Sequence, residues 1–126
     1  MLLLSSALIF VAVGAVFLAF PQQYGQLLEL SLPTAMSRTD VRATYGGLEL
    51  GFGVFLILCV VRREWTRAGL WALALATGGF AAGRIVGLAF ERTISSVMAG
   101  FLALEIVVTL LAVFVLRASG SKASPG

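Results

Sequence analysis

The chain has 126 residues, of which 60% are hydrophobic and 12% are charged, and its mean hydropathy is +1.02. An average soluble domain holds roughly 45–50% apolar and about 25% charged residues. A water-soluble protein of this size could not bury so much apolar surface. Its net charge of +3 is small, and its basic residues lie beside apolar runs, which suits lipid headgroups better than nucleic acid. We therefore expect one membrane-embedded domain that binds no nucleic acid.

Histidine is absent and Cys59 is the single cysteine. The absence of histidine removes the most common zinc and haem ligand and the usual near-neutral proton carrier. A lone cysteine forms neither an internal disulfide nor a two-cysteine redox pair. We expect no metal, no cofactor and no enzymatic activity. The weaker alternative is lipid chemistry with Glu49 or Glu105 as a general base, for which no nucleophile–base pair is visible.

The first apolar run covers residues 2–20 and ends at Pro21. It lacks a basic start and a small-residue cleavage site, so we interpret it as a retained span rather than a signal peptide. Residues 21–41 mix leucines with polar residues, which fits either a short interfacial helix followed by a loop or an ordinary linker. Asp40 or Thr39 is the expected N-cap of the next helix.

Three further apolar runs predict membrane-spanning helices, at residues 41–61, 68–90 and 94–116. A helix of about 20 residues crosses a hydrocarbon core of about 30 Å. The turn at 62–67 is short, so the second and third spans should be antiparallel neighbours. The expected fold is all-α, an antiparallel bundle of four transmembrane helices over residues 1–117. Residues 118–126 form a polar tail that we expect to be disordered.

Basic residues are unevenly divided between the two ends of these spans. The end shared by the termini and the 62–67 turn carries Arg62, Arg63, Arg67, Arg117 and Lys122. The opposite end carries Arg38, Arg42 and Arg92. Because basic loops stay on the cytoplasmic side, this predicts a multi-pass protein of a bacterial inner membrane with both termini in the cytoplasm.

Glycines recur at close spacing in the second and third spans. The positions we expect at helix contacts are Gly46, Gly47, Gly51, Gly79, Gly83 and Gly87. In the third span the glycines repeat every four residues, so they share one helix face and allow a second backbone to approach. A pore or ligand groove along that face is the less favoured interpretation.

Charged and polar side chains interrupt these apolar spans, most densely in the sequence RATYGGLELGFG at residues 42–53. The five side chains of interest are Arg42, Tyr45, Glu49, Arg84 and Glu105. A charge at membrane depth costs about 2.5–3.5 kcal/mol on insertion scales, so it normally faces a partner or a wet cavity. At about 1.5 Å per residue, Glu49 and Arg84 lie about 10 Å and Glu105 about 13 Å below the same membrane face. We therefore predict that the five residues form one cluster.

Pairing within this cluster follows from charge. Arg84 cannot lose its proton, so it needs Glu49, Glu105 or both beside it. Two carboxylates around one guanidinium leave a negative charge, which either Arg42 or the protonation of one glutamate would balance. Tyr45 lies four residues before Glu49 and could donate a hydrogen bond to it. The cluster is either a set of structural ion pairs or a polar pocket, and we favour the pocket because intramembrane charges usually mark function.

These motifs resemble a known family. The sequence Arg-Ala-x-Tyr-Gly-Gly-Leu at 42–48 with Glu49, the Gly-Arg pair at 83–84 followed by Gly87, and Glu105 resemble the uncharacterised bacterial domain of unknown function 4345. That family is similar, at a distance, to DoxX-like proteins. The resemblance spans the chain apart from its tail and implies a four-helix inner-membrane protein. It implies no activity.

Three functions are compatible with this sequence. We favour non-enzymatic binding of a lipid-like or amphipathic molecule at the charged cluster, with residues 21–41 as a lid and membrane lipids as partners. One alternative is a small proton-coupled transporter working as a homodimer, although the first span lacks the expected carboxylate. The other is a structural or accessory subunit that docks on a larger membrane complex through its glycine face.

Overall fold

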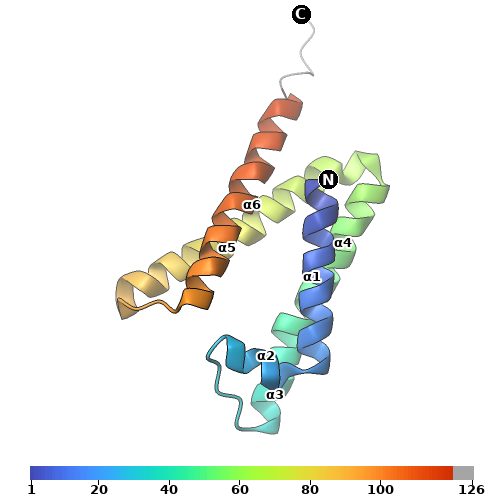
Figure 1. Cartoon of the computed structure of the whole chain (residues 1–126). Coiled ribbons are helices and arrows are strands. Elements are labelled where there is room, and N and C mark those ends of the chain that lie inside the picture. The colour runs from blue at the N-terminus through green and yellow to red at the C-terminus, as the bar shows by residue number, and fades with distance from the viewer. Residues whose placement is uncertain (121–126) are drawn as a thin grey trace, which may run out of the picture. The chain divides into compact units, whose positions relative to one another are not determined.

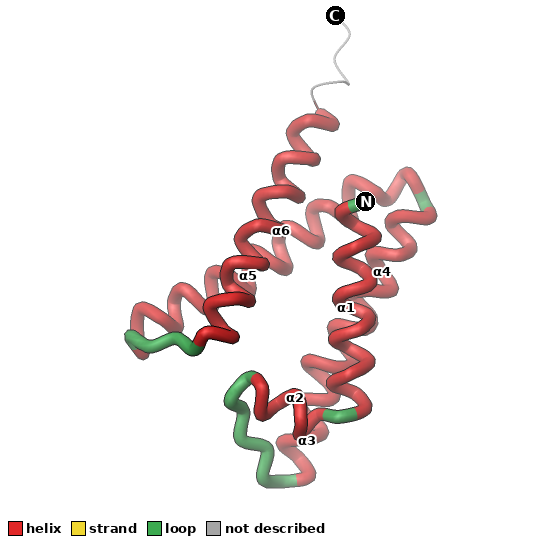
Figure 2. The backbone as a smooth tube through the Cα atoms, in the orientation of Figure 1, coloured by secondary structure: helices red, strands yellow, loops and turns green. Residues whose placement is uncertain are grey.

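The computed structural model describes residues 1–120, and these are helical apart from short connections (Figure 1, Figure 2). Four helices are long and apolar enough to cross a membrane: Leu2–Ala19, Ala35–Val61, Arg63–Glu91 and Ser96–Gly120. The prediction of an all-helical protein with four membrane-spanning helices is therefore confirmed. The chain divides into two compact units, residues 3–61 and 62–120.

The first unit contains α1, α2 and one long helix built from three successive segments. Their bounds are Leu2–Ala19 for α1, Pro21–Leu27 for α2, Ala35–Val41 for α3, Arg42–Leu48 for a π-helical segment and Glu49–Val61 for α4. Pro21 begins α2, where its missing N–H and fixed φ suit the first turn of a helix. The expectation of a short helix followed by a loop is thus met by α2 and the connection at 28–34.

Glycines bring α1 and the long helix into backbone contact. A Cβ atom on Gly46 would lie 2.8 Å from Leu18 Cγ. A Cβ on Gly14 would lie 2.5 Å from Leu50 N, and one on Gly53 would lie 2.8 Å from Val11 N. Such distances leave no room for a side chain. Along the long helix the contacting residues run from 46 to 53, whereas their partners on α1 run from 18 back to 11. The two helices are therefore antiparallel. Figure 1 shows them side by side.

The long helix begins earlier than the sequence suggested. Its N-cap is Thr34, which accepts a hydrogen bond from Ser37 N at 3.0 Å, while Thr34 N donates to Ser37 Oγ at 3.2 Å. This reciprocal pair satisfies two backbone donors at once. The prediction of Asp40 or Thr39 as the N-cap is wrong, because both residues already lie inside α3. The Thr39 hydroxyl instead donates to a backbone carbonyl one turn back.

The second unit is a helical hairpin of α5 (Thr66–Glu91) and α6 (Ser96–Gly120), preceded by the 3₁₀ turn Arg63–Trp65. Arg92 adopts a left-handed conformation at φ 52°, and its N–H donates to Leu88 O at 2.9 Å, which ends α5. Because α6 continues to Gly120, residues 118–120 are helical rather than part of the expected tail. The rest of that tail, 121–126, lies outside the described residues.

Candidate functional site

An ion pair joins the two helices of the hairpin. Arg84 on α5 donates through Nε to both carboxylate oxygens of Glu105 on α6, each at 3.0 Å. The sequence predicted that Arg84 needs a carboxylate but left open which glutamate supplies it. The structure identifies Glu105. Sharing one N–H between two oxygens leaves the two terminal nitrogens of the guanidinium for other contacts.

Two apolar side chains of α6 complete the surroundings of Arg84. Its Nη1 lies 3.0 Å from Met98 Sδ, and its Cζ lies 5.4 Å from the centroid of the Phe101 ring. Sulfur is a weak acceptor, and the aromatic face attracts a cation. Within residues 1–120, no group accepts a hydrogen bond from Nη2 of Arg84. Glu105 therefore compensates the charge of the Arg84 guanidinium, whereas not all of its N–H groups have an acceptor within residues 1–120.

The pair lies well inside the apolar hairpin. The helix α5 has 26 residues, so it is about 39 Å long, against a hydrocarbon core of about 30 Å. Arg84 precedes the end of α5 by seven residues, or about 10 Å along the helix axis. The side chain of Glu105 is 10% exposed and that of Arg84 is 24% exposed. Neither charge is solvated as it would be on a soluble surface.

A pair of threonines makes a second polar contact in the hairpin. The hydroxyls of Thr77 on α5 and Thr109 on α6 lie 2.7 Å apart. Each also lies within hydrogen-bond distance of a carbonyl one turn back, Leu73 O at 2.8 Å and Glu105 O at 2.7 Å. Two hydroxyl protons thus serve three short contacts, so at most two of them are hydrogen bonds at one moment. This contact and the ion pair fix the register of α5 against α6.

In the first unit, Arg42 and Tyr45 both contact the end of α1. Arg42 Nε donates to Leu18 O at 3.0 Å, where the carbonyls of the last turn have no partner in their own helix. A cation there also opposes the negative end of the helix dipole. The Tyr45 ring lies on Phe17, with centroids 5.3 Å apart. Both residues therefore help to hold α1 against the long helix.

The most polar stretch of the sequence forms an unusual helix. All seven residues of Arg42–Leu48 are π-helical, inside a helix that is otherwise α-helical. The π-helix is rare and occurs mostly as single turns, frequently at functional sites. Arg42 and Gly46, at the start and near the end of this segment, both meet Leu18 of α1. Periodicity based on 3.6 residues per turn does not reveal this segment.

Comparison with known proteins places the chain in a family. Residues 1–116 match the family model described as a domain of unknown function, DUF4345. The chain belongs to this family. The resemblance inferred from residues 42–49, 83–87 and 105 is therefore confirmed, whereas the distant kinship with DoxX-like proteins stays a prediction. The sequence has no match among curated proteins and none among solved structures.

The five side chains proposed as one cluster are divided between the two units of this DUF4345 protein. Arg84 and Glu105 belong to the second unit and contact each other. Arg42, Tyr45 and Glu49 belong to the first, with Glu49 in the first turn of α4. The gathering of all five, and the hydrogen bond from Tyr45 to Glu49, stay predictions. Within residues 1–120 no three His, Cys, Asp or Glu side chains gather as metal ligands.

The glycines of this DUF4345 protein differ in what they contact. Gly46 lies in close contact with Leu18. Gly47 has only an ordinary contact of 3.7 Å, and a Cβ at Gly51, Gly79, Gly83 or Gly87 would meet no atom within 4 Å. Packing along the α5 stripe stays a prediction. Sequence reasoning missed Gly14, because an isolated glycine in an apolar run has no spacing pattern that marks it. It also left out Gly53, although this residue lies in the glycine-rich stretch at 42–53.

Proposed function

We propose that this protein is a non-enzymatic membrane protein that binds a lipid-like or amphipathic molecule at the Arg84–Glu105 pair. One observation supports this most directly. The Arg84 guanidinium lies about 10 Å below the end of an apolar helix, and within residues 1–120 no group accepts a hydrogen bond from its Nη2. Arg84 is only partly buried, so this nitrogen is accessible to a ligand, and intramembrane charge normally serves function.

The chemistry of the pair limits the ligand. Glu105 already compensates the charge of Arg84, so the pair as a whole is neutral. A second anion would meet the Glu105 carboxylate, whereas an oxygen acceptor without a full charge would meet only open N–H donors. Met98 and Phe101 supply an apolar surround. The ligand that fits is an apolar molecule with an acceptor oxygen, as membrane lipids have.

A purely structural pair is the competing explanation, and paired substitution separates the two. Removing both charges with Arg84→Met/Glu105→Leu leaves no unpaired ion, and such replacements are often neutral or stabilising. Thr77→Val/Thr109→Val is the matched control, because it removes the other polar contact of the same hairpin and leaves the pair intact.

Native mass spectrometry of gently extracted protein is the test. We expect a specific adduct on the wild type and on the threonine control, and its loss from the Arg84→Met/Glu105→Leu variant with an unchanged helical circular dichroism spectrum. An adduct retained by that variant, or bare protein in every sample, would reject ligand binding at this pair.

We further propose a bacterial inner-membrane location with both termini in the cytoplasm, which the loop charges favour. A reporter enzyme that is active only in the periplasm should be inactive when it is fused after residue 120. The same enzyme should be active when it is fused between Arg92 and Ser95. The opposite pattern would reject this orientation.

A structural subunit of a membrane complex, or a homodimer, is the second candidate. The glycine stripe of α5 at Gly79, Gly83 and Gly87 favours it, because small residues let a neighbouring helix approach. Proton-coupled transport is less favoured, since Arg84 engages both oxygens of Glu105. A partner or second copy that is lost with Gly83→Leu and retained with Gly100→Leu would support the subunit role. A wild-type protein that runs alone as a monomer would exclude it.

A further inference from the structure

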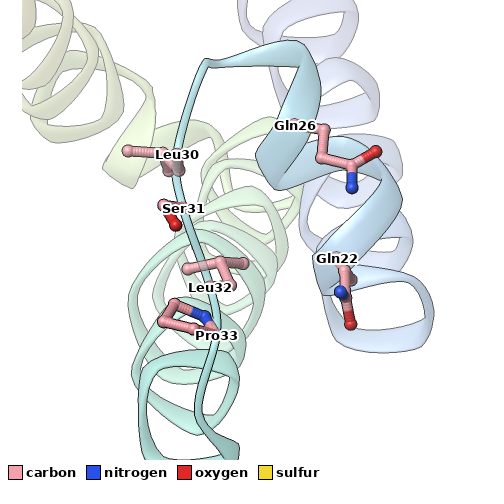
Figure 3. Close-up of a pocket in the computed structure, with 6 residues that line it drawn as sticks. All are labelled: Gln22, Gln26, Leu30, Ser31, Leu32 and Pro33. Carbon is pink, nitrogen blue, oxygen red and sulfur yellow. The ribbon is translucent and has the colours of Figure 1, made fainter.

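A cavity of about 240 Å³ lies between α2 and the extended segment 30–33 (Figure 3). Six residues line it: Gln22, Gln26, Leu30, Ser31, Leu32 and Pro33. The two glutamines come from the helix, and the other four residues come from the segment beside it (Figure 3). Its volume is below the about 300–1,000 Å³ of ordinary ligand pockets, so it suits a single small group.

Several contacts build this cavity. Glu29 turns the chain with a left-handed φ of 58°, and Leu30 N then donates to Gly25 O at 2.9 Å. A Cβ on Gly25 would lie 2.7 Å from Leu32 Cδ1, so the segment folds over α2 where a glycine leaves space. Arg38 Nη1 donates to Leu32 O at 3.3 Å and holds the segment from its other side. These contacts tie the segment to α2 through Gly25 and to α3 through Arg38.

The cavity lining has no charged side chain. Gln22 and Gln26 are one helical turn apart, and each amide offers two donors and an acceptor. The Ser31 hydroxyl can both donate and accept, and Leu30, Leu32 and Pro33 supply apolar edges. Hydroxyl groups also both donate and accept, so amides pair with several adjacent hydroxyls more completely than with an anion or a cation.

The position of the cavity indicates how such a group would arrive. The segment 20–34 connects the membrane-spanning α1 to the helix at Ala35–Val61, so it lies at one end of two spans. A headgroup at that level is held at high local concentration by its acyl chains. We propose that the cavity binds an uncharged polyhydroxylated group, a sugar or glycerol, presented by a membrane lipid or free in solution. This site is independent of the one at Arg84.

Nuclear magnetic resonance of the full chain in dodecylphosphocholine micelles tests the proposal, with the Ser31 backbone amide as reporter. Octyl-β-D-glucoside should give a saturable shift at Ser31. Tetraethylene glycol octyl ether, which has the same tail and no hydroxyl-rich head, and octyl phosphate should give none. Methyl-β-D-glucoside distinguishes the source, because binding as tight as that of octyl glucoside means a free sugar and weaker binding means a membrane lipid.

A neighbouring glutamine supplies the control variant. Gln22→Ala/Gln26→Ala should weaken octyl glucoside binding roughly tenfold, since each lost hydrogen bond contributes about 0.5–1.5 kcal/mol. Gln23→Ala, on the same helix and outside the lining, should leave affinity unchanged. Equal shifts from the ether or the phosphate, equal weakening by Gln23→Ala, or no saturable shift with any probe would overturn the proposal.

Discussion

At the scale of single residues, the position of Arg84 within an apolar helix determines which side chain must lie beside it. Arginine keeps its charge in all conditions, so burial in an apolar helix requires a carboxylate, and the sequence predicts this requirement. That Glu105 pairs with Arg84 could not be read from the sequence, because Glu49 and Glu105 were expected at similar depths. It depends on which helices form the hairpin and on the register that Thr77 and Thr109 set.

Breaking this pair should cost more stability than removing it. Glu105→Leu leaves a charged guanidinium without its carboxylate, and we expect a loss of about 3 kcal/mol. Adding Arg84→Met should restore most of that loss, because no buried charge then remains. Thermal unfolding followed by circular dichroism in detergent checks this order. A double variant less stable than Glu105→Leu alone would show that the pair contributes net stability.

At the scale of elements, packing decides features that composition does not. Of the glycines placed at helix contacts from their spacing, Gly46 makes a close approach, and so do Gly14 and Gly53, which were not in that set. Contact depends on where the neighbouring backbone runs, and spacing along one helix carries no such information. The π-helical segment at Arg42–Leu48 likewise contacts α1, a segment far from it in the sequence.

Two glycines of α4 give a matched test of this packing. Gly53→Ala would place a Cβ 2.8 Å from Val11 N and 2.9 Å from Ala7 O, so the helices must separate and stability should fall by about 1–3 kcal/mol. Gly51→Ala meets no atom within 4 Å and should be neutral or slightly stabilising, by up to about 1 kcal/mol. Unfolding of both variants in the same detergent measures the contrast. Equal effects would contradict the antiparallel contact.

At the scale of the whole molecule, composition was the most informative feature. The 60% hydrophobic content and the length of each apolar run predict four spans, and four such helices are present. This prediction succeeded because hydrocarbon thickness sets helix length almost independently of packing. The start of the second span was misplaced by six residues, since the capping pair Thr34 and Ser37 precedes the apolar run that marks it.

The whole-molecule account also separates fold from function. Membership of the DUF4345 family agrees with the four spans, but it assigns no activity. Any functional conclusion must therefore come from individual side chains and their contacts. The intramembrane guanidinium of Arg84 is the group whose chemistry bears most directly on that conclusion.

The most direct measurement is therefore the nitrogen-15 side-chain spectrum of arginine-labelled protein in nanodiscs of its native lipids, compared with delipidated protein in detergent. We predict that the Nη protons of Arg84, assigned with Arg84→Lys, shift and exchange more slowly with water in the native lipids, because an acceptor oxygen occupies the open donors. Its Nε proton, held by Glu105, should change little between the two samples. Identical Nη signals in both samples would contradict ligand binding and leave the pair a structural contact between α5 and α6.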